Sequence, residues 1–295
     1  DQCLVEGDFV SLVVKVNGGA PDALKIIGNK GGETFGPLEK GKEYYCRTIR
    51  LDPGPNEIAV EAVEKGVVVG SKKVTVFRRS DISRRYNFAP PEFERAPFHE
   101  EAREAVCKTC HRMDLSGRDV HPARIEESMC FQCHRRITSY SNVHGPAARW
   151  DCLTCHERDS KPQRFATRKP EKELCYTCHK EKQEEWTPKK YFHGPTATGK
   201  CSICHSPHAS DNPFWLKKTT WNLCVTCHED RASGAHVVVG IGSGTHPTKG
   251  KPDPLRYGKE LTCASCHNPH ASNSKSLFSN NEDDPYSLCK GCHKF

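Results

Sequence analysis

One five-residue pattern, Cys-x-x-Cys-His, occurs eight times and limits what this chain can fold into. It uses sixteen of the 18 cysteines in 295 residues. Zinc ribbons and disulfide frameworks also use Cys-x-x-Cys, but neither needs a histidine directly after each pair. Histidine fills only 16 positions of the chain, so eight chance occurrences after a pair are excluded. In c-type haem attachment the two cysteines form thioethers and the histidine ligates iron. The pattern therefore predicts eight covalently attached haems.

The predicted ligands of these haems fall into two lists, with the haems numbered 1 to 8 in motif order. The attachment cysteines are Cys107, Cys110, Cys130, Cys133, Cys152, Cys155, Cys175, Cys178, Cys201, Cys204, Cys224, Cys227, Cys263, Cys266, Cys289 and Cys292. The adjoining (proximal) iron ligands are His111, His134, His156, His179, His205, His228, His267 and His293.

Eight further histidines match the eight distal ligands that bis-histidine haems need. They are His99, His121, His144, His193, His208, His236, His246 and His270. A lone histidine is more often a surface or packing residue, but here the count equals the demand. All-histidine coordination implies low reduction potentials relative to Met/His haems. The two methionines, Met113 and Met129, are expected to pack rather than to ligate iron.

The short string Cys-Ser-Ile-Cys-His-Ser-Pro-His at residues 201–208 places a second histidine three residues after the first. Three residues cannot carry the chain around the rim of a porphyrin to its opposite face. We therefore expect His208, and likewise His270 after His267, to ligate a neighbouring haem. No histidine lies between His156 and Cys175, and His236 is expected to supply that deficit, although the iron it serves stays open.

The motifs repeat in pairs, which defines four dihaem modules. Within the pairs the first cysteines are 23, 23, 23 and 26 residues apart. His99, His144 and His193 each stand eight residues before the first cysteine of a pair, whereas an insertion moves the fourth candidate, His246, further upstream. The chain thus predicts an octahaem domain over residues 99–295 built from four repeats of roughly fifty residues.

Residues 1–80 contain no haem motif and have the pattern of short strands. Ile58, Val60 and Ala62 alternate, Lys65 and Gly66 follow at a turn, and residues 74–76 alternate on the return. About six such strands predict a small immunoglobulin-like β-sandwich. Residues 81–98, which contain two adjacent prolines, are predicted as a linker. The two remaining cysteines, Cys3 and Cys46, are expected to form a disulfide, with two free buried thiols as the alternative.

Composition sets the character of the haem domain. Only 35% of the residues are hydrophobic, and the 189 residues from Cys107 to Phe295 leave about 24 per haem. We therefore expect the porphyrins to form the interior, wrapped in coil and short helices. The net charge of +7 is no indication of nucleic-acid binding. Each haem with two ionised propionates adds about −1 when ferric and about −2 when ferrous, which brings the holoprotein to about −1 oxidised and about −9 reduced.

Compartment follows from the same chemistry. Haem attachment to this motif takes place outside the cytoplasm, so we expect a periplasmic or, by preference, an extracellular or cell-surface protein. No signal peptide precedes Asp1, and no apolar run reaches transmembrane length. The sequence therefore predicts a mature chain that does not span a membrane, and because Cys3 is not the first residue, no lipid-modified terminal cysteine is expected.

The strings CSICHSPHAS with LCVTCH, and CASCHNPHAS with LCKGCH, resemble the doubled-CxxCH family of multihaem cytochromes. The resemblance is strongest over residues 201–228 and 263–293, extends weakly over 99–295, and omits the β domain. It implies that Cys201, Cys204 and His205 hold one haem and that Cys263, Cys266 and His267 hold another. Relatives of this kind carry electrons in the periplasm or outside the cell, notably in metal-respiring bacteria. Some are partners of outer-membrane porins, and other multihaem cytochromes polymerise into extracellular filaments.

Two functions compete. An electron conduit needs only saturated irons, whereas a multihaem reductase of a nitrogen or sulfur oxyanion needs an iron with an open position. Eight regular motifs and eight distal candidates favour the conduit, with no catalytic residues. Its partners would be other redox proteins, copies of itself, an outer-membrane porin or a terminal extracellular acceptor. Exposed haems at the two ends of a linear series also lead to the hypothesis of a head-to-tail filament, with the β domain at the interface.

Overall fold

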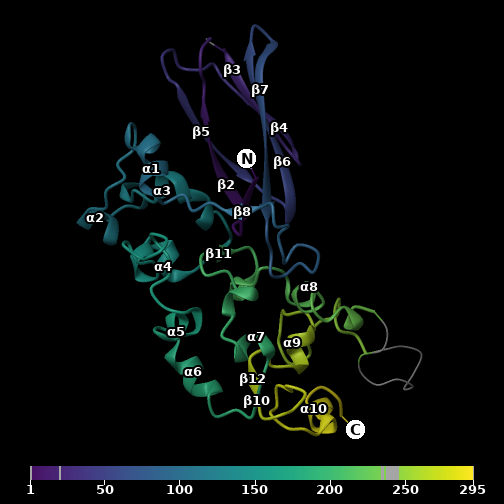
Figure 1. Cartoon of the computed structure of the whole chain (residues 1–295). Helices are drawn as coiled ribbons and strands as arrows, with labels where there is room; N and C mark the ends of the chain where they lie inside the picture. Colours follow the sequence, from purple (N-terminus) through teal and green to yellow (C-terminus); the bar gives the residue numbers. More distant parts are fainter. Residues whose placement is uncertain (1, 20, 234–235, 237–245, 295) are drawn as a thin grey trace. The chain divides into compact units, whose positions relative to one another are not determined.

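The computed structural model describes residues 2–19, 21–233, 236 and 246–294, and it divides into two compact units, Asp1–Phe98 and His99–Phe295 (Figure 1). The strands of the first unit are β1 (Gln2–Val5), β2 (Phe9–Lys15), β3 (Ala23–Gly28), β4 (Gly31–Phe35), β5 (Tyr44–Arg50), β6 (Gly54–Glu64), β7 (Val67–Arg78) and β8 (Glu94–Arg95). They form a six-stranded sheet in the order β4-β3-β6-β7-β1-β8 and a two-stranded sheet of β2 and β5.

The predicted hairpin is the longest pairing of the first unit. β6 and β7 pair antiparallel from Gly54 opposite Arg78 to Glu64 opposite Val67, with a bulge near Ala62. The connecting residues Lys65 and Gly66 both have positive φ, 50° and 81°, which is the backbone of the hairpin turns that match strand twist. The alternation seen in the sequence therefore follows the two faces of β6.

Side chains from both sheets meet in one core. Ile26, Leu51, Ile58 and Val76 are buried there, and apolar side chains of β2 and β5 pack against them. Burying such side chains is what stabilises two stacked sheets. The first unit is thus the strand-rich domain that the sequence predicts.

Two expectations for this unit are wrong. Residues 81–98 are not a separate linker, because β8 pairs with β1 and the ring of Phe93 packs 5.3 Å from that of Phe77. Cys3 and Cys46 are not bridged. Cys3 is half-buried on β1 of the larger sheet, while Cys46 is exposed on β5 of the smaller one. Local strand patterns carry no information on which cysteines meet.

The second unit consists of short elements joined by coil. Its helices are α1 (Glu101–Lys108), α2 (Gly117–Val120), α3 (Phe131–His134), α4 (Gly145–Ala148), α5 (Glu171–Tyr176), α6 (Lys180–Trp186), α7 (Gly194–Ala197), α8 (Thr220–Cys224), α9 (Cys263–Cys266) and α10 (Pro285–Lys290). Its 3₁₀ turns are Ile125–Glu127, Arg135–Thr138, Cys152–Thr154, Cys201–Ile203, Pro213–Trp215 and Glu229–Arg231. Its strands are β9 (Asn142–Val143), β10 (Tyr191–Phe192), β11 (Ala209–Ser210) and β12 (Ala271–Ser272).

Few large apolar side chains are buried in this unit. Among its described residues they are Met113, Trp150 and Leu261. Such a small apolar core cannot hold 197 residues in one arrangement by itself. The expected character of this unit, coil and short helices, is confirmed. No helix in the described ranges has both the length and the apolar content to cross a membrane.

The core of the first unit gives a stability prediction. Replacing Ile58 with alanine removes a fully buried side chain and should lower the free energy of unfolding of the β domain by about 2–5 kcal/mol. Val69→Ala, on the exposed end of β7, should change it by less than about 0.5 kcal/mol. Denaturant titration of the two variants measures the difference, and equal effects would contradict this core.

The two free cysteines of the first unit, Cys3 and Cys46, give a second prediction. Without reductant, iodoacetamide should label the exposed Cys46 in the native protein and label Cys3 as well after unfolding. Intact mass after alkylation counts the labels. A protein that takes up no label under either condition would restore the disulfide.

Candidate functional site

All eight Cys-x-x-Cys-His motifs share one backbone hydrogen bond. In each, the histidine N–H donates to the carbonyl of the first cysteine, four residues earlier, at 2.8–3.0 Å. Residues four and three apart lie on the same face of a helical turn. The two sulfurs and the imidazole of a motif therefore face one side, as attachment of a single macrocycle requires.

Seven of the motif histidines face the ring of a second histidine across a gap. The ring centroids are 5.9–6.2 Å apart in the pairs His134–His99, His156–His208, His179–His144, His205–His270, His228–His193, His267–His236 and His293–His246. A metal–nitrogen bond of about 2 Å on each side, plus the radius of each ring, separates the centroids of two axial imidazoles by roughly 6 Å. The gaps therefore fit an iron between each pair, and a bound haem would supply one-electron redox chemistry there.

The upstream histidine of a module faces the second motif of the same module. His99, His144 and His193 each lie opposite the histidine 35 residues later. His246 has the same role in module 4 despite the insertion, although its ring is turned 77° from that of His293. The histidine that the sequence places eight residues before a pair thus serves the second haem of that pair.

The histidines that closely follow a motif face the preceding module. His208 lies opposite His156, and His270 lies opposite His205, with interplanar angles of 13° in both pairs. Neither faces the histidine three residues before it. His236 does not fill the deficit of module 2, because it lies opposite His267 in module 4. His208 supplies that ring instead.

The first motif is the exception. Within the described residues His111 has no second imidazole facing it, and its Nδ1 bonds to Oε1 of Gln132 at 2.6 Å. The remaining candidate, His121, bonds through Nδ1 to Oδ1 of Asp151 at 3.0 Å and is largely exposed. The structure therefore does not bring His111 and His121 together as an axial pair.

Two short strand pairs each hold together the two distal histidines that serve the haems of one module. β11 pairs with β9, and the N–H of His144 donates to the carbonyl of His208 at 2.8 Å. β12 pairs with β10, and the N–H of His193 donates to the carbonyl of His270 at 3.0 Å. The distal rings of haems 3 and 4, and those of haems 5 and 6, are thereby held in fixed relation.

The proline before His208 or His270 orients the other distal ring that is held by the same strand pair. The carbonyl of Pro207 accepts a hydrogen bond from the His144 side chain, and the carbonyl of Pro269 accepts one from His193. A hydrogen bond at one ring nitrogen sets the tautomer and leaves the other nitrogen for the metal. One peptide, residues 205–208, thus carries a ligand of haem 5, a ligand of haem 3 and the hydrogen-bond partner of a haem 4 ligand.

Three proximal histidines share a second repeated feature, a side-chain hydrogen bond that closes a loop. The Nδ1 atoms of His156, His205 and His267 bond to carbonyl oxygens nine residues later, at 2.7–2.8 Å. Isolated bridges at the same histidines close these loops onto Thr167, Leu216 and Phe278. Module 1 differs, because Arg112 instead binds the buried carboxylate of Asp119 at 2.6 and 2.9 Å. The loop is therefore a feature of modules 2 to 4.

Burial keeps several of these rings neutral. It lowers the pKa of His208 to about 4, with a further contribution from the nearby rings of His156 and His134. Burial, together with His205 and His193, likewise lowers the pKa of His270 to about 4. Since iron binds the unprotonated nitrogen, these two histidines are ready to ligate at neutral pH.

Contacts between motifs join all eight in sequence. The first cysteines meet between modules, with side-chain hydrogen bonds in the pairs Cys130–Cys152, Cys175–Cys201 and Cys224–Cys263. The second cysteines approach within modules, in the pairs Cys155–Cys178, Cys204–Cys227 and Cys266–Cys292, closely enough to interact electrostatically. Motif 1 touches motif 2 through His111 and Gln132. Each motif therefore neighbours the next along the chain.

The hydrogen bond between paired thiols affects their pKa values in opposite directions. It lowers the pKa of Cys130 to about 7 and, together with burial, raises that of Cys152. Cys175 and Cys201 repeat the pattern. Both thiols of each pair belong to attachment motifs, so the contact places two attachment sites next to each other.

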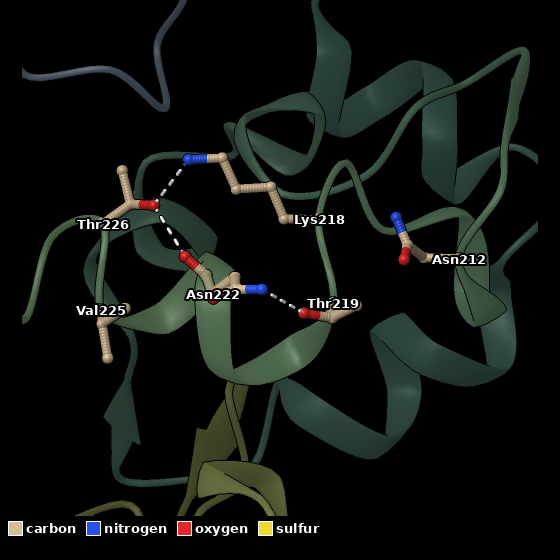
Figure 2. Close-up of a pocket in the computed structure, with 6 residues that line it drawn as sticks. All are labelled: Asn212, Lys218, Thr219, Asn222, Val225 and Thr226. Carbon is tan, nitrogen blue, oxygen red and sulfur yellow. Dashed lines mark hydrogen bonds between the residues drawn. The ribbon is translucent and has the colours of Figure 1, made fainter. Parts of the chain in front are cut away.

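A polar pocket of about 620 Å³ is lined in part by motif 6, and its lining residues are drawn in Figure 2. Its lining residues are Asn212, Lys218, Thr219, Asn222, Val225 and Thr226. The hydroxyl of Thr226 donates to the carbonyl of Asn222 at 2.8 Å and accepts from Lys218 at 3.0 Å. None of the lining residues is a cysteine or histidine, so the pocket has no haem-attaching group of its own.

Several residues that orient these histidines have no recognisable pattern in the sequence. Glu104 bonds to Nδ1 of His99 at 2.9 Å, and Asp151 bonds to His121. The prolines before His208 and His270 were visible in both strings, but the role of their carbonyls depends on the β-bridges. Met113 is buried, and neither it nor Met129 replaces a histidine in the seven pairs.

The pairing predicts the effect of removing one distal ring. Relative to the wild-type protein, His208→Ala should add one high-spin haem per chain and one binding site for carbon monoxide in the reduced protein, because haem 3 loses a ligand. The double variant with His270→Ala should add two, since haem 5 also loses its distal ligand. Met129→Leu is the control and should leave the spectrum unchanged. A protein in which His208→Ala adds no high-spin haem would contradict the pairing.

Comparison with known proteins agrees with this geometry. Three segments, residues 144–184, 193–233 and 253–295, match the model of the doubled CXXCH motif family. The first two segments begin at His144 and His193, the distal histidines of modules 2 and 3. Module 1, which lacks the nine-residue loop of modules 2 to 4, lies outside the matched segments.

No curated protein matches the chain significantly. One solved structure found by similarity is titled "Structures of Clostridium thermocellum CbhA fibronectin(III)-like modules". It is 17% identical, covers 26% of this chain and 88% of that chain, and has a TM-score of 0.20. The doubled CXXCH motifs, with the paired imidazoles, support a multihaem c-type cytochrome that binds haem c covalently.

Proposed function

We propose that this protein is an octahaem electron conduit in periplasmic or extracellular respiration. The unbroken series of contacts from motif 1 to motif 8 carries this proposal. Electrons pass readily only between redox centres whose edges are close, and here every attachment site neighbours the next. At seven of the eight motifs, an imidazole on each face would exclude substrate from the iron, which suits transfer rather than catalysis.

Haem content is the first requirement of the proposal. The denatured holoprotein should have the mass of the polypeptide plus eight haems, and pyridine haemochrome absorbance should give eight haems per chain. Fewer haems would break the series at the missing motif.

A haem of raised potential in the middle of the series would retain electrons and so tests whether they travel through the series. Methionine as an axial ligand raises the potential of a haem, so His270→Met should make haem 5 an electron sink. We expect the rate of electron transfer from a soluble donor to a soluble acceptor to fall several-fold, while Met129→Leu leaves it unchanged. An undiminished rate at the same haem content would mean that electrons do not pass haem 5.

One observation favours a second candidate, a reductase of a nitrogen or sulfur oxyanion. Such an enzyme needs an iron with an open position, and His111 is the motif histidine that the described structure leaves without a facing ring. The alternative therefore places substrate at haem 1. Carbon monoxide binding to one haem of the reduced wild-type protein, with fast reoxidation by nitrite, hydroxylamine or sulfite, would establish it. No binding and slow reoxidation would support the conduit.

The partners and location belong to the same proposal. Covalent haem attachment supports a location outside the cytoplasm, and a conduit there would exchange electrons with redox proteins, with a porin-bound complex, with a terminal acceptor or with copies of itself. The exposed side chains of residues 290–294 around His293 offer haem 8 for such a contact. In a head-to-tail filament that contact would repeat without closing. Electron microscopy of the concentrated protein distinguishes filaments from monomers.

A further inference from the structure

Three distal histidines occupy equivalent places but differ in what holds their second nitrogen. His144 and His193 donate to the backbone carbonyls of Pro207 and Pro269. His99, in the same position of module 1, bonds instead to the carboxylate of Glu104, with 2.9 Å between Nδ1 and Oε1. The chain therefore contains its own comparison between a neutral and a charged partner for one type of ligand.

The carboxylate of Glu104 is held on both oxygens. It lies on α1, three residues before Cys107 of haem 1, and is 2% exposed. Its Oε2 accepts a hydrogen bond from Nη1 of Arg164 at 2.7 Å. The Arg164 guanidinium lies 5.1 Å from the ring of Phe165, and that ring packs 4.7 Å from His99. Few alternative positions remain for Glu104, so its bond to His99 is a fixed part of the site.

A carboxylate partner changes the ligand more than a carbonyl does. A hydrogen bond to an ionised acceptor is roughly twice as strong as one between neutral groups. It draws the ring proton away from Nδ1 and makes the other nitrogen a more basic ligand. A more basic ligand, with a buried negative charge near the iron, stabilises the ferric form over the ferrous form.

We propose that Glu104 is a positioning residue that holds haem 2 at a lower reduction potential than haems 4 and 6. This inference rests on the conduit proposed above and adds to it an uneven profile of potentials, with haem 2 reduced after its equivalents. Arg164 opposes the effect, because its positive charge withdraws electron density from the carboxylate. Substitutions at the two residues should therefore shift the potential of haem 2 in opposite directions.

The test is a haem-resolved redox titration of the intact holoprotein, followed by EPR and NMR signals of the ferric haems. Glu104→Gln should favour reduction of haem 2 by on the order of tenfold, which is a shift of about +59 mV for a one-electron couple. Arg164→Gln should shift haem 2 to a lower potential. Glu101→Gln removes the same charge from an exposed position on α1 and should leave haem 2 nearly unchanged.

The outcomes separate this inference from the proposed function. Eight haems and the spin states of the wild-type protein in all three variants, with haem 2 shifted upward by Glu104→Gln and downward by Arg164→Gln, support it. Shifts of the same sign in both variants would indicate a structural role only and would overturn the inference. A Glu104→Gln shift no larger than that of Glu101→Gln would also overturn it. Missing haems in the wild-type protein would overturn the conduit itself.

Discussion

The gap of about 6 Å between facing imidazole rings is the constraint on which the second unit depends. Each gap fits an iron bound from two sides, and one ring of each pair belongs to a motif that attaches the same macrocycle through two sulfurs. In a unit with so few buried apolar side chains among its described residues, these bonds would replace the packing that a core provides. Metal binding and folding are then coupled, so haem attachment determines the order of the polypeptide as well as its redox chemistry.

Pairing of histidines across modules joins modules 2, 3 and 4 to one another. If every module supplied both rings of its own haems, adjacent modules could move independently. His208 and His270 instead reach back to the preceding module, and β11 and β12 hold them beside His144 and His193. Short peptides with fixed hydrogen bonds would then set the spacing between bound irons, which suits the proposed electron transfer because its rate depends on distance.

Much of this site follows from the sequence because its chemistry is local. The turn of Cys-x-x-Cys-His, the upstream histidine eight residues before a pair, and the inability of His208 to serve its own haem are all consequences of chain length and residue type. Which iron His208 or His236 faces is not local, because it depends on how modules stack. Glu104 gave no signal, since one glutamate in an acidic helix differs from its neighbours only by its burial.

The first unit shows the same limit. Alternation in residues 58–62 predicts the hairpin. The pairing of β8 with β1, in contrast, joins residues about ninety positions apart, and no pattern in residues 81–98 indicates it. The disulfide was inferred from the count of spare cysteines, whereas bond formation needs two sulfurs in contact. Cys3 and Cys46 are both free, and Cys46 is exposed on its strand.

An experimental density map of the haem-loaded protein would test the central claim most directly, because it locates each iron relative to the histidines. The account predicts one iron between His156 and His208 and another between His205 and His270, so that each of these haems takes its two axial ligands from adjacent modules. A map in which both axial ligands of each haem come from its own module would contradict it.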